Sequence, residues 1–277
     1  MLKTRIITAL VLLAVLLPVL YLNNFPAFAV IATAFFGAAV WESFRIFKNR
    51  QALLIAAVWT AAFAYAFFGS GGMGQVKFWF GLSVAIWLIR FVPSLATGLP
   101  PLEGLGNTLL SLVYAVTIVG CFVAIVALFL HSPLYLLSVM ALVWIADIGA
   151  YFSGKAFGKR KLAPSISPGK SWEGAIGGGI AVLVIASATI LAAPSWPVLQ
   201  DTFAVQLQLR HGWLTALLVL LVVVAASIVG DLFESQLKRR AGIKDSSNLL
   251  PGHGGVLDRI DALIPVLPFA ALVGAWV

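Results

Sequence analysis

Long apolar runs alternate with short polar segments along the whole chain. Each run has about the 17–25 residues that a helix needs to cross the hydrocarbon core of a bilayer. The runs lack the alternation of a strand, and lipid favours helices because their backbone groups pair within one segment. We therefore predict an all-α, polytopic integral membrane protein with about nine transmembrane helices. Their expected bounds are 5–22, 27–47, 51–69, 76–92, 107–130, 133–154, 174–194, 212–236 and 256–276.

The composition and the charge distribution agree with this class. Of 277 residues, 61% are hydrophobic and 10% are charged, whereas a soluble domain carries about 25% charged residues. If the N-terminus is cytoplasmic, only Lys77 and Arg210 of the 18 Lys and Arg residues fall on the outer side. This bias follows the positive-inside rule, so the net charge of +8 reflects topology and we expect no nucleic-acid partner. The same topology places the polar loops 155–173 and 238–255 on the cytoplasmic side.

Carboxylates gather in the second half of the chain. Eight of the ten Asp and Glu residues follow residue 131. In the first half, Glu42 is interpreted as a membrane-edge ion pair with Arg45, with a functional role as the open alternative, and Glu103 as part of a solvated turn. We therefore divide the chain into residues 1–130, which form a scaffold of lipid-facing or dimer-facing helices, and residues 131–277, which form the catalytic region.

The segment 235–261 is dense in charge and glycine and lies between two apolar runs. Ionisable groups at a membrane are costly and usually mark function. Just before it, Asp231, Ser235 and Lys238 have the spacing i, i+4, i+7 and share one helix face, with Glu234 at its edge. A simple Asp–Lys or Glu–Lys pair that closes the helix end is an alternative that the spacing leaves open.

A glycine-rich turn, residues 251–255, precedes the last predicted helix. Such turns let backbone N–H groups approach phosphate oxygens. A phosphate contact is therefore a better interpretation of His253, which lies in this turn, than general-base catalysis. Asp231 and Asp258, on neighbouring helices, are placed to hold one hard cation, and Mg²⁺ prefers carboxylate oxygens together with substrate phosphates. The segment thus combines acidic side chains that can bind a metal, Lys and Arg side chains that can bind phosphates, and glycines that allow a close approach of the backbone. This combination indicates phosphoryl or nucleotidyl transfer.

The loop 155–173 has a similar character. Asp147, Tyr151 and Gly154 lie along one face of the preceding helix, where small residues also favour close helix contact. The sequence Gly169-Lys170-Ser171 imitates the end of a P-loop. Pro164 stands where that motif requires glycine, and no hydrophobic strand precedes it, so we reject a P-loop.

At these residues the chain resembles a known family. The pattern Ser235-x-Leu237-Lys238-Arg239, Lys244-Asp245-x-Ser247 and Leu250-Pro251-x-His253-Gly254-Gly255-Val256-x-Asp258-Arg259-Ile260-Asp261 is similar to the signature of the phosphatidate cytidylyltransferases. The segment Ser167-Pro168-x-Lys170-Ser171-x-Glu173-Gly174 and the Asp147-x-x-x-Tyr151 helix are also similar to that family.

The resemblance implies transfer of CMP from CTP to phosphatidate, which gives CDP-diacylglycerol and pyrophosphate in phospholipid biosynthesis. It also implies Mg²⁺ dependence, a second ion such as K⁺, a homodimer, and a multi-pass protein of the bacterial inner membrane whose active site faces the cytoplasm. A CTP-dependent lipid kinase and a membrane transporter are the alternatives.

By position, the resemblance assigns roles to individual residues. The expected catalytic residues are Asp231, Asp258, Lys238 and Lys244. The expected substrate-binding residues are Ser235, Arg239, His253, Gly254, Gly255, Arg259, Lys170 and Ser171. The expected metal ligands are Asp231 and Asp258, with Asp261, Asp147 and Glu173 as further candidates.

Overall fold

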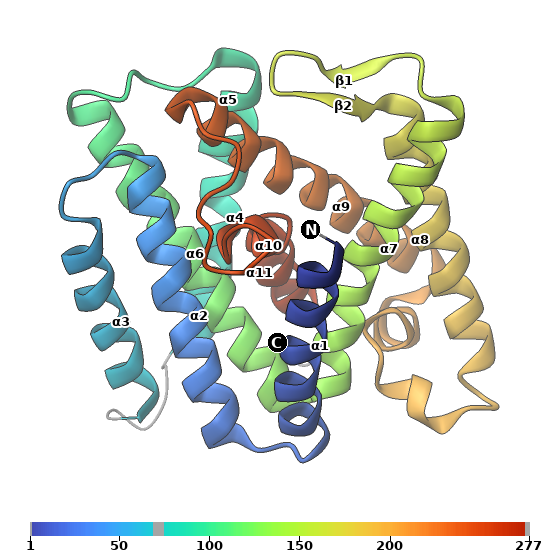
Figure 1. The fold of residues 1–277 in the computed structure, drawn as a ribbon. Helices are drawn as coiled ribbons and strands as arrows, with labels where there is room; N and C mark the ends of the chain where they lie inside the picture. The colour runs from blue at the N-terminus through green and yellow to red at the C-terminus, as the bar shows by residue number, and fades with distance from the viewer. Residues whose placement is uncertain (1, 69–74, 275–277) are drawn as a thin grey trace.

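The structure is a computed structural model that describes the backbone of residues 2–68 and 75–274. The side chains of residues 2–6, 9, 12, 67 and 68 are not described, so the predicted placement of Lys3 and Arg5 lies outside the described part. The chain forms a bundle of helices with one small hairpin (Figure 1). In order, the elements are α1 (Leu2–Tyr21), α2 (Phe25–Ile46), α3 (Ala52–Phe68), α4 (Val76–Ile86), η1 (Trp87–Phe91), α5 (Val92–Thr97), α6 (Leu105–His131), α7 (Pro133–Phe157), β1 (Lys161–Ala163), β2 (Ser167–Ser171), α8 (Trp172–Ala192), η2 (Pro197–Asp201), α9 (Phe203–Ala241), α10 (Leu257–Ile260) and α11 (Leu263–Val273).

Six helices in the described residues are long and apolar enough to cross a membrane. They are α2, the continuous rod Val76–Thr97, α6, α7, α8 and α9. The chain is therefore a helical protein with the character of a multi-pass membrane protein, as predicted. The count of nine spans and the cytoplasmic N-terminus stay predictions.

The last predicted span, 256–276, differs most from expectation. It contains the four-residue α10 and the eleven-residue α11, and a helix of eleven residues is only about 16 Å long. Most of α11 is buried against α4, α6 and α9, and Figure 1 shows α10 and α11 in the middle of the bundle. This apolar run supplies a core for the other helices.

Two helices that carry candidate residues pack unusually closely. A Cβ atom added at Gly149 of α7 would lie 2.8 Å from the Cβ of Ala181, and one added at Gly178 of α8 would lie 2.6 Å from the carbonyl oxygen of Ala146. Gly154 also faces α8, where Gly174 lies opposite. The predicted close contact at the small residues of α7 is therefore confirmed.

The candidate residues of α9 depend on how this helix is held. Gly212, with φ of 77°, separates residues 203–211 from the long membrane-crossing part of α9, which begins where the sequence predicted. Phe233 of α9 stacks on Phe91 at 4.3 Å between ring centroids, and Tyr114 lies at 5.3 Å. Gly242, with φ of 73°, ends α9. The aromatic cluster thus fixes the turn of α9 that precedes Glu234.

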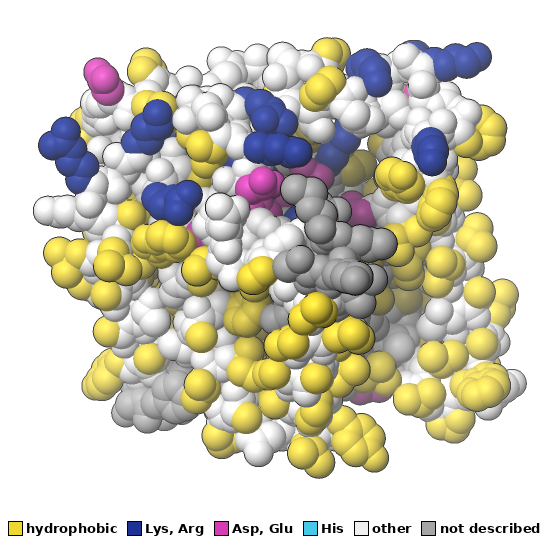
Figure 2. All heavy atoms as spheres, viewed as in Figure 1, with side chains coloured by type: hydrophobic (Ala, Val, Ile, Leu, Met, Phe, Trp, Pro, Cys, Tyr) yellow, Lys and Arg dark blue, Asp and Glu magenta, His cyan; other side chains and the backbone are white. Residues whose placement is uncertain are grey.

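The hairpin of β1 and β2, which the all-α prediction missed, is the one β-sheet in the described residues; Leu250 and Gly254 add an isolated antiparallel bridge. The strands are antiparallel, with Lys161 opposite Ser171. The hairpin lies at the same end of the bundle as the loop after α9 (Figure 1). Figure 2 shows Lys and Arg side chains gathered at that end, whereas most of the coloured side chains lower on this face are hydrophobic. The two polar loops therefore lie on one side of the molecule, as predicted.

Candidate active site

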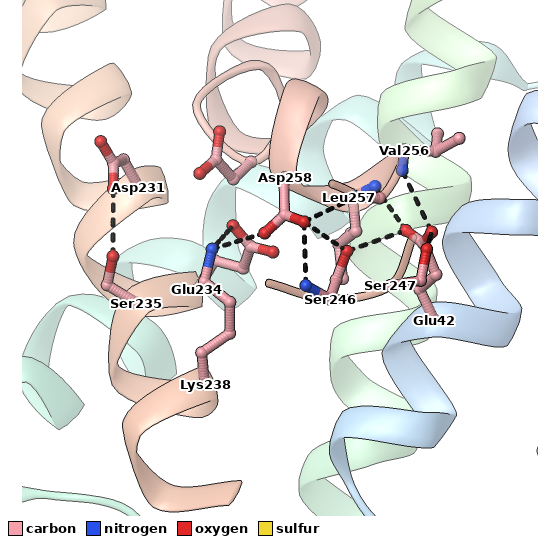
Figure 3. A network of polar contacts seen from close by, with 12 residues as sticks. Glu42, Asp231, Glu234, Ser235, Lys238, Ser246, Ser247, Val256, Leu257 and Asp258 are labelled. Atoms are coloured by element: carbon pink, nitrogen blue, oxygen red, sulfur yellow. Dashed lines mark hydrogen bonds and ion pairs between the residues drawn. The ribbon is translucent and has the colours of Figure 1, made fainter. Parts of the chain in front are cut away.

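Asp258, in the first turn of α10, is a hub of hydrogen bonds. Its Oδ1 accepts from Lys238 Nζ at 2.6 Å, and its Oδ2 accepts at 2.8 Å from Ser246 N, Ser246 Oγ and Gly255 N. Figure 3 shows these contacts. Burial raises the pKa of Asp258, but the hydrogen bonds from Lys238 and the backbone outweigh it, so the pKa lies below its usual value. Asp258 is therefore a carboxylate at neutral pH.

Lys238 joins α9 to α10. Its Nζ lies 3.0 Å from Glu234 Oε2, one turn earlier on the same helix, and also binds Asp258. The simple Glu–Lys pair that the spacing left open is thus present. The same lysine also reaches Asp258, just after the loop that leads from α9 into α10 (residues 242–257), which we call the signature loop. One turn further back, Ser235 Oγ donates to Asp231 Oδ1 at 3.2 Å. The predicted common face of Asp231 and Ser235 is confirmed.

A second acid–lysine pair joins the hairpin to α9. Lys170 Nζ of β2 lies 2.6 Å from Asp231 Oδ2. Both side chains line a cavity of about 480 Å³ between α7, α8 and α9. Asp147, Tyr151 and Gly154, which the sequence placed on one face, line the same cavity. The structure therefore brings together candidates from three segments that are far apart in the sequence.

The walls of this cavity change in character. The backbones and side chains of Ala146, Ala150, Val224 and Ile228 form an apolar part, and the acids and lysines form a polar part. A cavity of this kind suits an amphipathic ligand that carries an anionic group, because the lysines offer charge and the apolar wall excludes water.

The interpretation of Glu42 as an ion pair with Arg45 is wrong. The Arg45 guanidinium instead lies over the Trp41 ring, 5.1 Å from its centroid. Glu42 is fully buried and faces the signature loop (Figure 3). Its carboxylate accepts hydrogen bonds from four groups, which are Ser246 Oγ, Ser247 Oγ, Val256 N and Leu257 N. The first half of the chain thus supplies an acid to the site. The sequence analysis did not predict this contact between Glu42 and the loop before α10.

The glycines of the signature turn have a steric reason. Gly254 has φ of 84°, a conformation that glycine adopts most readily. A Cβ atom added at Gly255 would lie 2.5 and 2.6 Å from the two carboxylate oxygens of Glu42, and still closer to Ser246 Oγ. In this structure the Gly255 amide donates a hydrogen bond to the carboxylate of Asp258, and the amides of Val256 and Leu257 donate to that of Glu42. The predicted phosphate contact of Gly254 and Gly255 stays a prediction.

Two candidates hold the hairpin onto α8. Glu173 accepts hydrogen bonds from the amides of Lys159 and Arg160, and its Oε1 lies 3.2 Å from Arg160 Nε. Ser171 Oγ accepts from Gly174 N at 3.1 Å and so caps α8. Ser171 ends a strand and Lys170 precedes it, which agrees with the rejection of a P-loop.

The remaining candidates are three exposed cations, His253 and Asp261, and the Asp261 carboxyl interacts with Glu234 and Asp231 of α9. Arg239, Lys244 and Arg259 are exposed, so they can meet a ligand from solution. His253 is half-buried, and its Nδ1 is buried without a hydrogen-bond partner among the described residues. Asp261 accepts a hydrogen bond from the next amide, Ala262 N, at 2.8 Å.

The carboxylate oxygens of Asp231 and Asp258 are the candidate ligands for a metal ion. Within the described residues, no three His, Cys, Asp or Glu side chains are grouped as a metal site. Each oxygen of Asp231 takes part in one polar contact, and Oδ1 of Asp258 accepts one hydrogen bond. A carboxylate oxygen has two lone pairs, so these oxygens can still bind a hard cation that completes its shell with water and phosphate.

Comparisons with known proteins agree with the motif. A family model described as "Cytidylyltransferase family" matches residues 3–277. A protein of Pseudomonas aeruginosa named phosphatidate cytidylyltransferase is 42% identical over 286 residues, which covers 99% of this chain and 98% of the relative. Proteins of the same name from Haemophilus influenzae and Bacillus subtilis are 38% and 31% identical, over 97% and 96% of this chain and 97% and 95% of the relatives.

Proposed function

Because the chain belongs to the cytidylyltransferase family, we propose that it transfers CMP from CTP to phosphatidate and forms CDP-diacylglycerol and pyrophosphate. One observation carries this assignment beyond the family. Two acid–lysine pairs, Lys170 with Asp231 and Lys238 with Asp258, join the hairpin, α9 and the signature loop into one polar site. That site adjoins a cavity with an apolar wall, as a lipid substrate with an anionic headgroup requires.

The reaction balances without a protein base. An oxygen of the phosphatidate monoester attacks the α-phosphorus of CTP and forms the new P–O bond. The bond from that phosphorus to the bridging oxygen of the β-phosphate breaks, and pyrophosphate leaves. A phosphomonoester has a second pKa near ~6, so the nucleophile is already ionised at neutral pH. The mechanism therefore requires no general base, and we do not assign that role to His253.

Positive charge is what this chemistry needs from the protein. Both substrates are anions, and negative charge grows on the leaving pyrophosphate. Lys170 and Lys238 are held at the site by their partners, and the exposed Lys244, Arg239 and Arg259 surround the loop. Fixed cations of this kind stabilise a developing charge without reorganisation of solvent.

We assign the Mg²⁺ site to Asp231 and Asp258, whose carboxylate oxygens keep free lone pairs. Bound there, Mg²⁺ would neutralise substrate phosphate charge. Asp147, which lines the cavity with Asp231, is a further candidate ligand. Glu173 is a weaker candidate, because its carboxylate is occupied by Lys159 and Arg160.

The finer features of the family are proposed on the same basis. They include a monovalent second ion such as K⁺, a homodimer formed through the helices of residues 1–130, and a cytoplasmic N-terminus. The bacterial relatives support the inner membrane as its location. The gathering of Lys and Arg at the end that carries both polar loops supports an active site on the cytoplasmic side (Figure 2).

The labelled position of CTP tests the reaction. Purified protein in detergent micelles receives phosphatidate and CTP labelled either in the cytosine ring or at the γ-phosphate. Label from the ring, and none from the γ-phosphate, should enter the lipid, with release of pyrophosphate. Entry of only the γ-label would identify a CTP-dependent lipid kinase instead, and no label in lipid from either form would refute the proposal.

A further inference from the structure

Glu42 is a buried charge that the reaction scheme above does not use. It lies in α2, about 200 residues before the signature loop, and its side chain is fully buried. A buried carboxylate is costly unless it is fully hydrogen-bonded. Glu42 meets that condition only through the signature loop, which supplies all four of the donors described above.

Two of these donors belong to the start of α10. The first N–H groups of a helix have no partner within the helix. Val256 N and Leu257 N donate to Glu42 at 3.1 and 2.6 Å, so a side chain of another helix caps α10. Asp258 is the second residue of α10. The orientation of that carboxylate is therefore fixed by the group that caps its helix.

A third donor links the two acids directly. Ser246 Oγ lies 3.1 Å from Glu42 Oε2 and 2.8 Å from Asp258 Oδ2. A hydroxyl has one hydrogen to donate, so the two carboxylates share it (Figure 3). A displacement of Glu42 would be passed to Asp258 both through this hydroxyl and through α10.

The contact requires a carboxylate at this position. Oε1 accepts from Val256 N and Ser247 Oγ, and Oε2 accepts from Leu257 N and Ser246 Oγ. Both oxygens thus face donors. In a glutamine, one of them would be an NH₂ group that donates only. The backbone N–H facing it would lose its acceptor, and the serine hydroxyl could only accept from it.

We propose that Glu42 is a positioning residue for the transfer reaction: it holds α10 and the loop 246–257 so that Asp258 is correctly placed. The role rests on the proposed function, but the contact itself does not. Two measurements on one set of variants separate the two claims.

The variants are Glu42→Gln, Glu42→Asp and the control Glu103→Gln. Glu103 also lies in the first half of the chain and is exposed, so its replacement makes the same charge change outside the site. Limited trypsin digestion in detergent reports on the loop 246–257, because Lys244 is exposed two residues before it. Steady-state kinetics, with CTP and Mg²⁺ varied separately, reports on Asp258.

We expect Glu42→Gln to be cleaved after Lys244 about tenfold faster than wild type and to lose about tenfold or more in kcat, because at least two hydrogen bonds to a buried charge are removed. It should also need more Mg²⁺ for half-maximal rate. Glu42→Asp, which keeps the charge, should restore part of both, and Glu103→Gln should match wild type.

A folded Glu42→Gln with wild-type kcat and Mg²⁺ dependence would overturn the proposal, even if it melted at a lower temperature, because Glu42 would then serve stability alone. If Glu42→Gln does not yield folded protein, Glu42→Asp decides, and a wild-type kcat in that variant overturns the proposal. A wild-type protein that makes no cytidine lipid would refute the proposed function, while unchanged cleavage in the variants would refute the contact.

Discussion

Replacement of Gly255 by alanine gives the sharpest steric test of the site. The added Cβ would lie 2.5 and 2.6 Å from the oxygens of Glu42, and closer still to Ser246 Oγ. Ordinary contacts begin at 3.4 Å, so the Glu42 carboxylate would have to retreat by about 3.4 − 2.5 = 0.9 Å. That movement breaks at least two hydrogen bonds to a charged group, each worth about 1.5–3 kcal/mol. We expect a loss of about 3–6 kcal/mol in the free energy of unfolding.

Thermal unfolding of purified protein in detergent measures this loss. At roughly 2–4 °C for each kcal/mol in a chain of about this size, the midpoint should fall by about 10 °C. The turnover of CTP should fall at least tenfold, because Ser246 also holds Asp258. Gly81→Ala is the matched control, because a Cβ there meets nothing within 4 Å and Gly81 lies in α4. It should be neutral or slightly stabilising. A Gly255→Ala protein with the midpoint and turnover of wild type would refute this account of the turn.

Three further substitutions test individual roles at the site. Asp258→Asn should abolish activity and leave a folded protein destabilised by about 1–3 kcal/mol, and wild-type turnover in membranes that contain it would rule out the metal role. Lys170→Met should change stability by less than about 1 kcal/mol, because the pair with Asp231 is partly exposed, yet lower kcat about 10²-fold; an unchanged kcat would remove Lys170 from the site. Lys244→Ala should raise KM for CTP, and unchanged CTP affinity and rate would show that this exposed lysine does not contact the nucleotide.

Local spacing predicted those parts of the site that lie within one helix. Asp231 and Ser235 share a face because a helix repeats every 3.6 residues, and the structure pairs them. The same periodicity brought Asp147, Tyr151 and Gly154 to one cavity wall. The gathering of charge at one end followed from the positive-inside rule.

Contacts between distant segments could not be read in this way. Lys170 is 61 residues from Asp231, and nothing in either segment names the other as its partner. Glu42 carried a signal, since an acid in an apolar helix is costly, but a neighbouring arginine offered a simpler explanation that proved wrong. A buried acid commonly needs several donors, and here two serines before the glycine turn and two amides after it supply them from the other end of the chain.

Hydropathy also did not separate a lipid-facing helix from a buried one. The run 256–276 is as apolar as a span, yet α11 has only eleven residues and packs among α4, α6 and α9. An apolar residue is equally suited to lipid and to a protein core, so composition alone leaves this open. The short hairpin was hidden for a related reason, because its three-residue and five-residue strands are too short for a periodic pattern.

The proposed mechanism depends above all on one divalent cation shared by Asp231 and Asp258. Crystals grown with Mn²⁺ in place of Mg²⁺ locate that ion by its anomalous scattering. The account predicts a peak about 2.0–2.2 Å from an oxygen of each acid, and its loss in Asp231→Asn crystals. A peak bound by neither acid, or by only one of them, would contradict it.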